Sequence, residues 1–406
     1  MNSKKFLLLL SIALVIIYIF PLALGFISLK GVLYLSFPII SFIIFPRAFF
    51  NKQTFWILIS VFFWIVLLLI RNDMQQLLWL QTFIFSWLNC LALSNLFIYK
   101  LNVLNLNIFG KTIFWIVLFS IFLSIPIVYN NPMMIRGVIT DANRNEIGAK
   151  EVFISMQRKG MVDYAFIHAI PSIFPLLFLL MKKETTLKYK YCYIFLIILI
   201  YYFILRTSFG TVIIISTILL LLCAITSENM KKNILRYSII GIITLPFLSV
   251  DFIVKLFSMV IPFFEGTIMA DKLTDIVFSI TTDTRIGQLE TRGDLYDMSL
   301  QSFLNSPVWG GKGVIGRHSM LIDFLGMFGL LGTVPLILFL YYILKNAYMK
   351  INYNFRIFFI FSILPYIILS LFKGTSGFTQ LFFISVFIPA LLIELTKKTK
   401  NKIKNV

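Results

Sequence analysis

Long apolar runs recur along the whole chain and are separated by short segments that carry most of the charge. A helix that crosses the hydrocarbon core of a membrane needs about 20 mostly apolar residues. The pattern predicts an all-α fold, a polytopic transmembrane helical bundle of about 12 spans in one integral membrane domain over residues 1–406. The expected spans are Phe6–Ile27, Gly31–Phe45, Phe55–Ile70, Leu77–Ile98, Thr112–Tyr129, Tyr164–Met181, Tyr191–Leu205, Phe209–Thr226, Ser238–Phe257, Ser319–Leu344, Ile357–Phe372 and Leu381–Leu395.

The composition agrees with a membrane protein. Hydrophobic residues make up 59% of the chain and charged residues only 13%, whereas a soluble domain has about 25% charged residues. A globule of this size cannot hide so much apolar surface from water, which excludes a soluble enzyme, a disordered chain and a secreted disulfide scaffold. The cysteines Cys90, Cys192 and Cys223 all lie inside apolar runs, so we expect neither disulfides nor a zinc site.

The formal net charge is +19, and the basic residues lie between the apolar runs. They do not form the basic patch of a folded nucleic-acid-binding domain, so we expect no nucleic-acid partner. Cytoplasmic loops of membrane proteins carry an excess of Lys and Arg. With the N-terminus in the cytoplasm, the cytoplasmic segments hold 21 of the 36 basic residues but only 3 of the 17 acidic ones. Both termini are therefore predicted to be cytoplasmic.

This orientation places two long loops, residues 130–163 and 259–318, on the outer face. The cytoplasmic loops are too short to form a domain that binds ATP or a nucleotide sugar. We therefore expect chemistry on the outer face, with a substrate that carries its own activated group. The larger outer loop is predicted to contain short amphipathic helices.

One of these helices is predicted from about Arg292 to Leu304. Thr291 and Asp294 have the spacing of a helix capping pair, and Pro307 is expected to end the helix. Glycine-rich residues then lead into a helix that is predicted to start near His318. That helix carries three glycines spaced so that neighbouring helices can approach closely, namely Gly326, Gly329 and Gly332.

The start of that helix is a favourable place for an anion, because its free N–H groups and positive dipole end lie beside Arg317 and His318.

Arg206 interrupts an apolar stretch at the turn between two expected spans. An arginine at that depth needs a polar partner or cavity, and its planar guanidinium suits phosphate. We expect these residues to line an outward cavity for a lipid-linked diphosphate. Arginine would stabilise the leaving diphosphate, and a neutral imidazole would accept the proton of an attacking hydroxyl. The chain lacks the clustered ligands typical of a metal site, so the reaction is expected to need neither metal nor cofactor.

Each of these residues also has an ordinary interpretation. His318 could be a solvated histidine at a helix start, Arg206 an anchor that extends to the headgroups, and Arg317 a merely positional charge. The loop residues Arg136, Arg285 and Arg292 could be surface charges, with contact to an acceptor sugar as the alternative for Arg136. His168, in the outer half of its span, is either part of the cavity wall or a buried, hydrogen-bonded histidine.

The segment Arg292–Pro335 resembles the O-antigen polymerase and O-antigen ligase superfamily of bacterial envelope glycosyltransferases. Members of this family show an arginine that opens a short outer helix, then His followed by Asn, Ser or Gln, nine residues and Gly-x-x-Gly. Here the motif is His318-Ser319, nine residues, and the tetrapeptide from Gly329 to Gly332. Arg206-Thr207 resembles the family's mid-chain arginine, although Leu205 replaces the usual serine.

The resemblance implies a polymerase of undecaprenyl-diphosphate-linked oligosaccharide repeat units, acting on the outer face of the bacterial cytoplasmic (inner) membrane to build lipopolysaccharide O-antigen or capsule. It implies that His318 is the base or the group that orients the acceptor, and that Arg206 and Arg292 contact the diphosphate. We add Arg317, Arg285, Arg136 and His168 as candidate substrate-binding residues. Membrane lipids, a chain-length regulator and a flippase are the expected partners.

The alternatives to a polymerase are an O-antigen ligase and a polysaccharide flippase or other transporter. Two sizeable outer loops favour the polymerase, and ionisable residues gathered at the outer ends of the spans favour an enzyme.

Overall fold

The computed structural model describes residues 3–23, 27–100, 104–130, 148–207, 209–227, 254–255, 257–259, 261–264, 268–282, 287–312, 315–373 and 377–404. Within these ranges every regular element is a helix. The predicted all-α fold is therefore confirmed for this part of the chain. The α-helices are α1 (Ser3–Ile19), α2 (Ile27–Ile44), α3 (Lys52–Arg71), α4 (Met74–Leu93), α5 (Leu106–Asn130), α7 (Ala149–Arg158), α8 (Tyr164–Ala169), α9 (Phe174–Lys183), α10 (Leu187–Arg206), α11 (Gly210–Ile225), α14 (Ile268–Thr282), α15 (Gly287–Asn305), α16 (Met320–Lys350), α17 (Arg356–Phe372), α18 (Phe378–Phe382) and α19 (Ile388–Lys404).

Eight helical segments of the described residues are long and apolar enough to cross a membrane, which confirms the transmembrane character. Two further expected spans are shorter apolar helices, Gly31–Ile44 and Gly210–Ile225. The first expected span is shorter than predicted, because α1 ends at Ile19, just before Pro21. The expected span Ser238–Phe257 lies almost wholly outside the described residues. The eight segments are Lys52–Arg71, Leu80–Tyr99, Leu106–Asn130, Tyr164–Lys183, Leu187–Arg206, Met320–Lys350, Tyr353–Phe372 and Phe378–Lys397.

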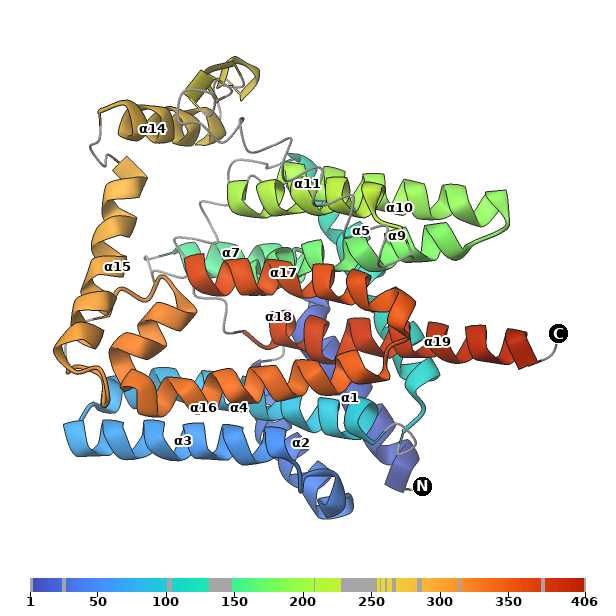
Figure 1. Cartoon of the computed structure of the whole chain (residues 1–406), viewed down its shortest axis with the longest axis horizontal. Helices are drawn as coiled ribbons and strands as arrows, with labels where there is room; N and C mark the ends of the chain where they lie inside the picture. The colour runs from blue at the N-terminus through green and yellow to red at the C-terminus, as the bar shows by residue number, and fades with distance from the viewer. Residues whose placement is uncertain are drawn as a thin grey trace.

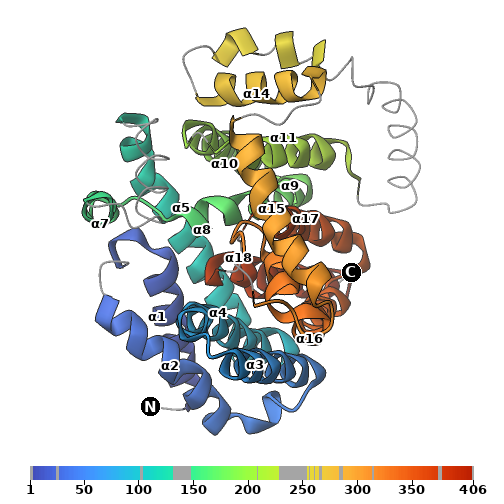
Figure 2. The same ribbon diagram turned by 90° about the vertical axis from the view of Figure 1, so that its left-hand side faces the viewer.

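Most of the long helices run along one common direction, and α15 lies across one end of this bundle (Figures 1 and 2). We call this the α15 end. The C-terminal ends of α3, α10 and α17 and the N-terminal end of α16 lie there (Figure 1). The start of α1 and the last turns of α19 lie toward the opposite end. Both chain ends are thus on one side of the bundle, and the orientation predicted from the charges assigns that side to the cytoplasm.

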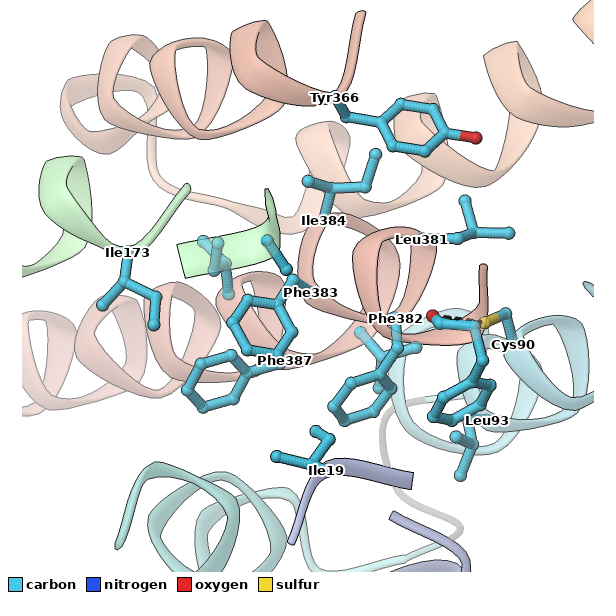
Figure 3. Close-up of a cluster of buried hydrophobic side chains, with 14 of the residues drawn as sticks. Ile19, Cys90, Leu93, Ile173, Tyr366, Leu381, Phe382, Phe383, Ile384 and Phe387 are labelled. Carbon is cyan, nitrogen blue, oxygen red and sulfur yellow. Dashed lines mark hydrogen bonds between the residues drawn. The ribbon is translucent and has the colours of Figure 1, made fainter. Parts of the chain in front are cut away.

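The centre of the bundle is the segment formed by α18, a π-helical turn (Phe383–Phe387) and α19. In its apolar window 83% of the residues are buried, against 28% for Leu187–Arg206 at the periphery. Since lipid is as apolar as these side chains, close packing rather than exclusion from water holds such a core together. Figure 3 shows this packing around Leu381, Phe382, Phe383, Ile384 and Phe387, with Ile19, Cys90, Leu93, Ile173 and Tyr366 from four other segments.

A break divides α16 at Gly329, whose φ of 59° and ψ of −160° are not helical. The turn that follows α15 fills this break. Leu330 N donates to Pro307 O at 2.8 Å, and Leu331 N donates to Val308 O at 3.1 Å. Backbone groups freed by a helix break inside a membrane protein need such partners, because lipid offers none. The two helices and their connector therefore form one hydrogen-bonded unit, which we call the α15–α16 hairpin.

Arg71, the last residue of α3, holds this hairpin from the side. Its guanidinium donates to four backbone carbonyls, at 2.6 Å to Trp309, 2.8 Å to Gly310, 3.0 Å to Gly311 and 2.6 Å to Met327. The guanidinium of Arg71 thus joins the turn after α15 to the carbonyl of Met327, which lies two residues before the break in α16. Charged donors make stronger hydrogen bonds than neutral ones.

The three glycines of α16 act differently from one another. A Cβ at Gly326 would lie 2.5 Å from Ser299 O, so this glycine lets α15 approach α16, as predicted. Gly332 lies against Trp64 of α3, whose indole N–H donates to Gly332 O at 3.0 Å. Gly329 instead provides the backbone break. The predicted close approach is thus confirmed for Gly326 and Gly332, whereas the backbone that approaches Gly329 is the turn after α15 and not a helix.

Two details of the predicted outer helix also differ. The helix ends at Asn305, before Pro307, as expected. It begins at Gly287, however, so Thr291 and Asp294 lie inside α15 and do not cap it. For the same reason Arg292 does not open the helix but lies in its second turn. The capping signature depends only on local spacing, whereas this helix continues upstream of it.

Candidate functional site

The connector into α16 is built around the carboxylate of Asp323 in the first turn of that helix. Asp323 is buried; its Oδ1 accepts from the Ser299 hydroxyl at 2.6 Å and its Oδ2 from Ser319 N at 2.9 Å. It also hydrogen bonds to the backbone of Arg317 and His318. A carboxylate is favoured at this place because the first turn of a helix has unpaired N–H groups. Asp323 therefore fixes the backbone that carries His318.

Asp323 is not among the residues that the sequence pattern singled out for this site. The signal was present, because a serine N-cap and an acidic residue in the first turn are typical of a helix start. Ser319 caps α16 by accepting from Ile322 N at 3.3 Å. The predicted start near His318 is therefore correct to within two residues.

Replacing Asp323 with asparagine tests this role. The amide keeps one acceptor oxygen but turns an NH₂ group toward at least one of the donors that now bind the carboxylate. We expect destabilisation of about 1–3 kcal/mol, measured as a lower melting temperature of the purified protein. Asp294→Asn, an exposed carboxylate of α15, is the matched control and should melt like the wild type. Equal melting temperatures for both variants would contradict the assigned role of Asp323.

His318 lies between the connector and α15. It is half-buried, and its ring centroid is 5.7 Å from that of Tyr296 on α15. The Tyr296 hydroxyl in turn donates to Phe372 O at 2.9 Å, at the end of α17. The imidazole is thus held where α15, α16 and α17 meet, at the α15 end of the bundle (Figure 2).

Lys373 directly follows α17 and is the residue that sequence reasoning missed. Its carbonyl accepts from Met320 N at 3.2 Å, which ties the end of α17 to the start of α16. Its side chain is only 9% exposed, and Nζ lies 3.4 Å from Nε2 of His168. The ammonium also lies over the rings of Tyr164 and Phe209, at 5.5 and 5.9 Å from their centroids. We call Lys373, His168, Tyr164 and Phe209 the Lys373 cluster.

His168 on α8 is 1% exposed, which confirms the interpretation as a buried, hydrogen-bonded histidine. Its Nδ1 lies 2.9 Å from Tyr164 O, one helical turn earlier. Its ring packs against Tyr164 and Phe209, with centroids 3.9 and 5.3 Å away. Its Nε2 faces the Lys373 ammonium, so the buried imidazole contacts a charged group.

Arg206 ends α10, three residues before Phe209 of the cluster. One guanidinium nitrogen donates to Tyr129 O at 2.9 Å, and the group lies 5.1 Å from the centre of the Tyr129 ring. Its Nε is buried and has no hydrogen-bond acceptor among the described residues. Arg206 is therefore close to the Lys373 cluster along the chain and has a buried donor nitrogen.

The remaining predicted residues are not brought together by the described structure. Arg317 is exposed and has a left-handed backbone, with φ of 53°. The backbone of Arg292 lies in α15. Arg285 and Arg136 lie outside the described residues.

Two of the larger cavities lined by described residues lie away from the Lys373 cluster and include none of its members. One, of about 250 Å³, is lined by Arg47 and Lys100 among others. The other, of about 180 Å³, lies between Lys111, Trp115 and Glu394. Since Arg47 precedes the start of α3, the first cavity lies near the end of the bundle opposite to α15 (Figure 1).

The candidate site thus consists of the Lys373–His168 pair, with His318 two residues from the backbone contact of Lys373 and Arg206 three residues before Phe209 of the cluster. Such a group can bind an oxyanion, stabilise negative charge on a leaving group and accept a proton. No protein-family model, curated protein or solved structure matches this chain.

Proposed function

We propose that the protein is a membrane glycosyltransferase that polymerises undecaprenyl-diphosphate-linked oligosaccharide repeat units on the outer face of the bacterial cytoplasmic membrane. The observation that carries this proposal is the contact of Lys373 with both His168 and the start of α16. It joins segments far apart in the sequence into one cationic site two residues from His318. This site lies at the end of the bundle that the charge distribution assigns to the outside.

The proposed reaction needs only groups of the chain and its two substrates. The bond between the anomeric carbon and the diphosphate oxygen breaks, and the oxygen of the acceptor hydroxyl forms the new glycosidic bond. His318 accepts the proton of that hydroxyl. The leaving group departs as undecaprenyl diphosphate, and its negative charge is stabilised by the nearby cations.

The acceptor distinguishes the polymerase from its closest alternative. A ligase would run the same chemistry with a finished glycan as donor and a different lipid as acceptor. A flippase would move the repeat unit without breaking a bond. A chain-length regulator and a flippase remain proposed partners of the polymerase.

The function is tested by deleting the gene in a host whose lipid-linked glycans can be extracted and sized. A polymerase deletion should leave single repeat units exposed on the outer face. Full-length polymer retained on undecaprenyl diphosphate would indicate a ligase instead, and single units confined to the inner face would indicate a flippase. Unchanged polymer in the deletion host would remove the proposal.

His318→Ala, expressed in the same deletion host, should fold and reach the membrane but fail to restore polymer. Loss of a general base typically costs about 10²–10⁴-fold in rate. Gln301→Ala is the matched control, because Gln301 is an exposed polar residue of the neighbouring α15. Polymer of normal length and amount from His318→Ala would show that His318 is not the base.

A further inference from the structure

We propose that Lys373, held in position by His168, is the side chain that binds a phosphate group of the diphosphate ligand. The inference rests on the proposed function for the identity of that ligand. It assigns the principal phosphate contact to a lysine that neither the motif nor the charge pattern singled out, and it makes His168 a positioning residue.

The hydrogen bonds of His168 determine which of its nitrogens faces the lysine as an acceptor. Nδ1 lies 2.9 Å from the backbone oxygen of Tyr164, which can only accept. The proton of the neutral ring is therefore assigned to Nδ1, and Nε2 carries the lone pair. Nε2 faces Nζ of Lys373 at 3.4 Å, so the ammonium donates to it.

The aromatic members of the cluster help to keep this ammonium in place. Its distances to the ring centres of Tyr164 and Phe209, 5.5 and 5.9 Å, are within the range of cation–π attraction. The two rings and the imidazole of His168 therefore orient a cation at a nearly buried position, where its attraction for an anion is screened less than at a surface.

Two neighbouring features add to the attraction. The backbone bond from Met320 N to Lys373 O places the lysine at the start of α16, two residues from His318. Arg206 precedes Phe209 by three residues, and its buried Nε has no acceptor among the described residues. A point charge from lysine and a fork from arginine suit the two phosphate groups of a diphosphate.

The test measures binding to the full-length protein in lipid nanodiscs by calorimetry, with three probes. These are inorganic pyrophosphate, farnesyl diphosphate and farnesol. We expect both diphosphates to bind and farnesol to bind much more weakly. Lys373→Met should weaken both diphosphates by at least about tenfold, whereas Lys373→Arg should retain most of the affinity. Lys345→Met, an exposed lysine on α16, is the matched control and should bind like the wild type.

His168 provides a second test that leaves the lysine intact, in case Lys373→Met does not fold. Glutamine at this position can still present an acceptor to the ammonium, whereas leucine cannot. His168→Leu should weaken pyrophosphate binding severalfold, and His168→Gln should restore a large part of it. Equal diphosphate affinity in wild type, Lys373→Met and His168→Leu would overturn the inference, as would equal losses in the two His168 variants.

The failure of this inference can be told apart from the failure of the proposed function. If Lys373→Met binds both diphosphates normally while the deletion host still accumulates single repeat units, Lys373 is not the phosphate contact but the polymerase proposal stands. If the wild-type protein binds farnesol as tightly as farnesyl diphosphate, the site recognises the chain rather than the phosphates. That result overturns the inference and removes the main support for the function.

Discussion

Replacing Gly329 with alanine should prevent the α15–α16 hairpin from forming and leave little folded protein. The backbone at Gly329, with φ of 59° and ψ of −160°, belongs to a region that is open almost only to glycine. This conformation alone costs another residue about 1–3 kcal/mol. A Cβ there would also lie 2.5 Å from the backbone nitrogen of Gly310, and backbone cannot move aside as a side chain can. The loss is measured as the yield of monodisperse protein and its melting temperature.

Gly31→Ala is the control for this substitution. Gly31 lies in α2, and no atom comes within 4 Å of a Cβ placed there. Since glycine is a poor helix former, alanine at position 31 should be neutral or slightly stabilising. If Gly329→Ala melted at the same temperature as Gly31→Ala, α16 would have to be a continuous helix.

Arg71→Leu should have the second-largest effect. It removes donors from four carbonyls that lie at the turn after α15 and at the break in α16. Hydrogen bonds from a charged donor contribute about 1.5–3 kcal/mol each, so we expect the stability to fall by about 3 kcal/mol or more. The change is measured as the melting temperature of the protein in nanodiscs.

Two comparisons separate the geometry of Arg71 from its charge. Arg71→Lys keeps the charge but not the planar fork, so it should recover only part of the stability. Arg47→Leu removes an exposed arginine and should change the stability little. A melting temperature of Arg71→Lys equal to the wild type would mean that only the charge at this position matters.

Hydropathy located the long helices well, because a run of about 20 apolar residues has few alternatives to a membrane helix. It could not locate the places where such helices change their geometry. The break at Gly329 and the π-helical turns Ser94–Tyr99 and Phe383–Phe387 leave the apolar pattern intact. These features depend on hydrogen bonds to other segments, which a one-dimensional pattern does not contain.

The candidate site was predictable only in part, for a similar reason. The glycine spacing and the helix start placed His318 correctly at the entry to α16. The contact between His168 and Lys373, however, joins residues 205 positions apart in the sequence. In the sequence Lys373 is simply a basic residue at the end of a span, and only the packing of α8 against α17 and α18 gives it a partner. The side of the membrane on which this site lies remains a prediction from the charges.

The break in α16 also sets a length. The part of α16 beyond Gly329 has about 20 residues and is thus about 30 Å long, sufficient by itself to cross the hydrocarbon layer. The part before the break, which follows His318, is not needed for crossing and can lie at the depth of the lipid headgroups. A diphosphate attached to a long isoprenoid is confined to that same depth. The glycine therefore sets how far the imidazole stands from the hydrocarbon layer.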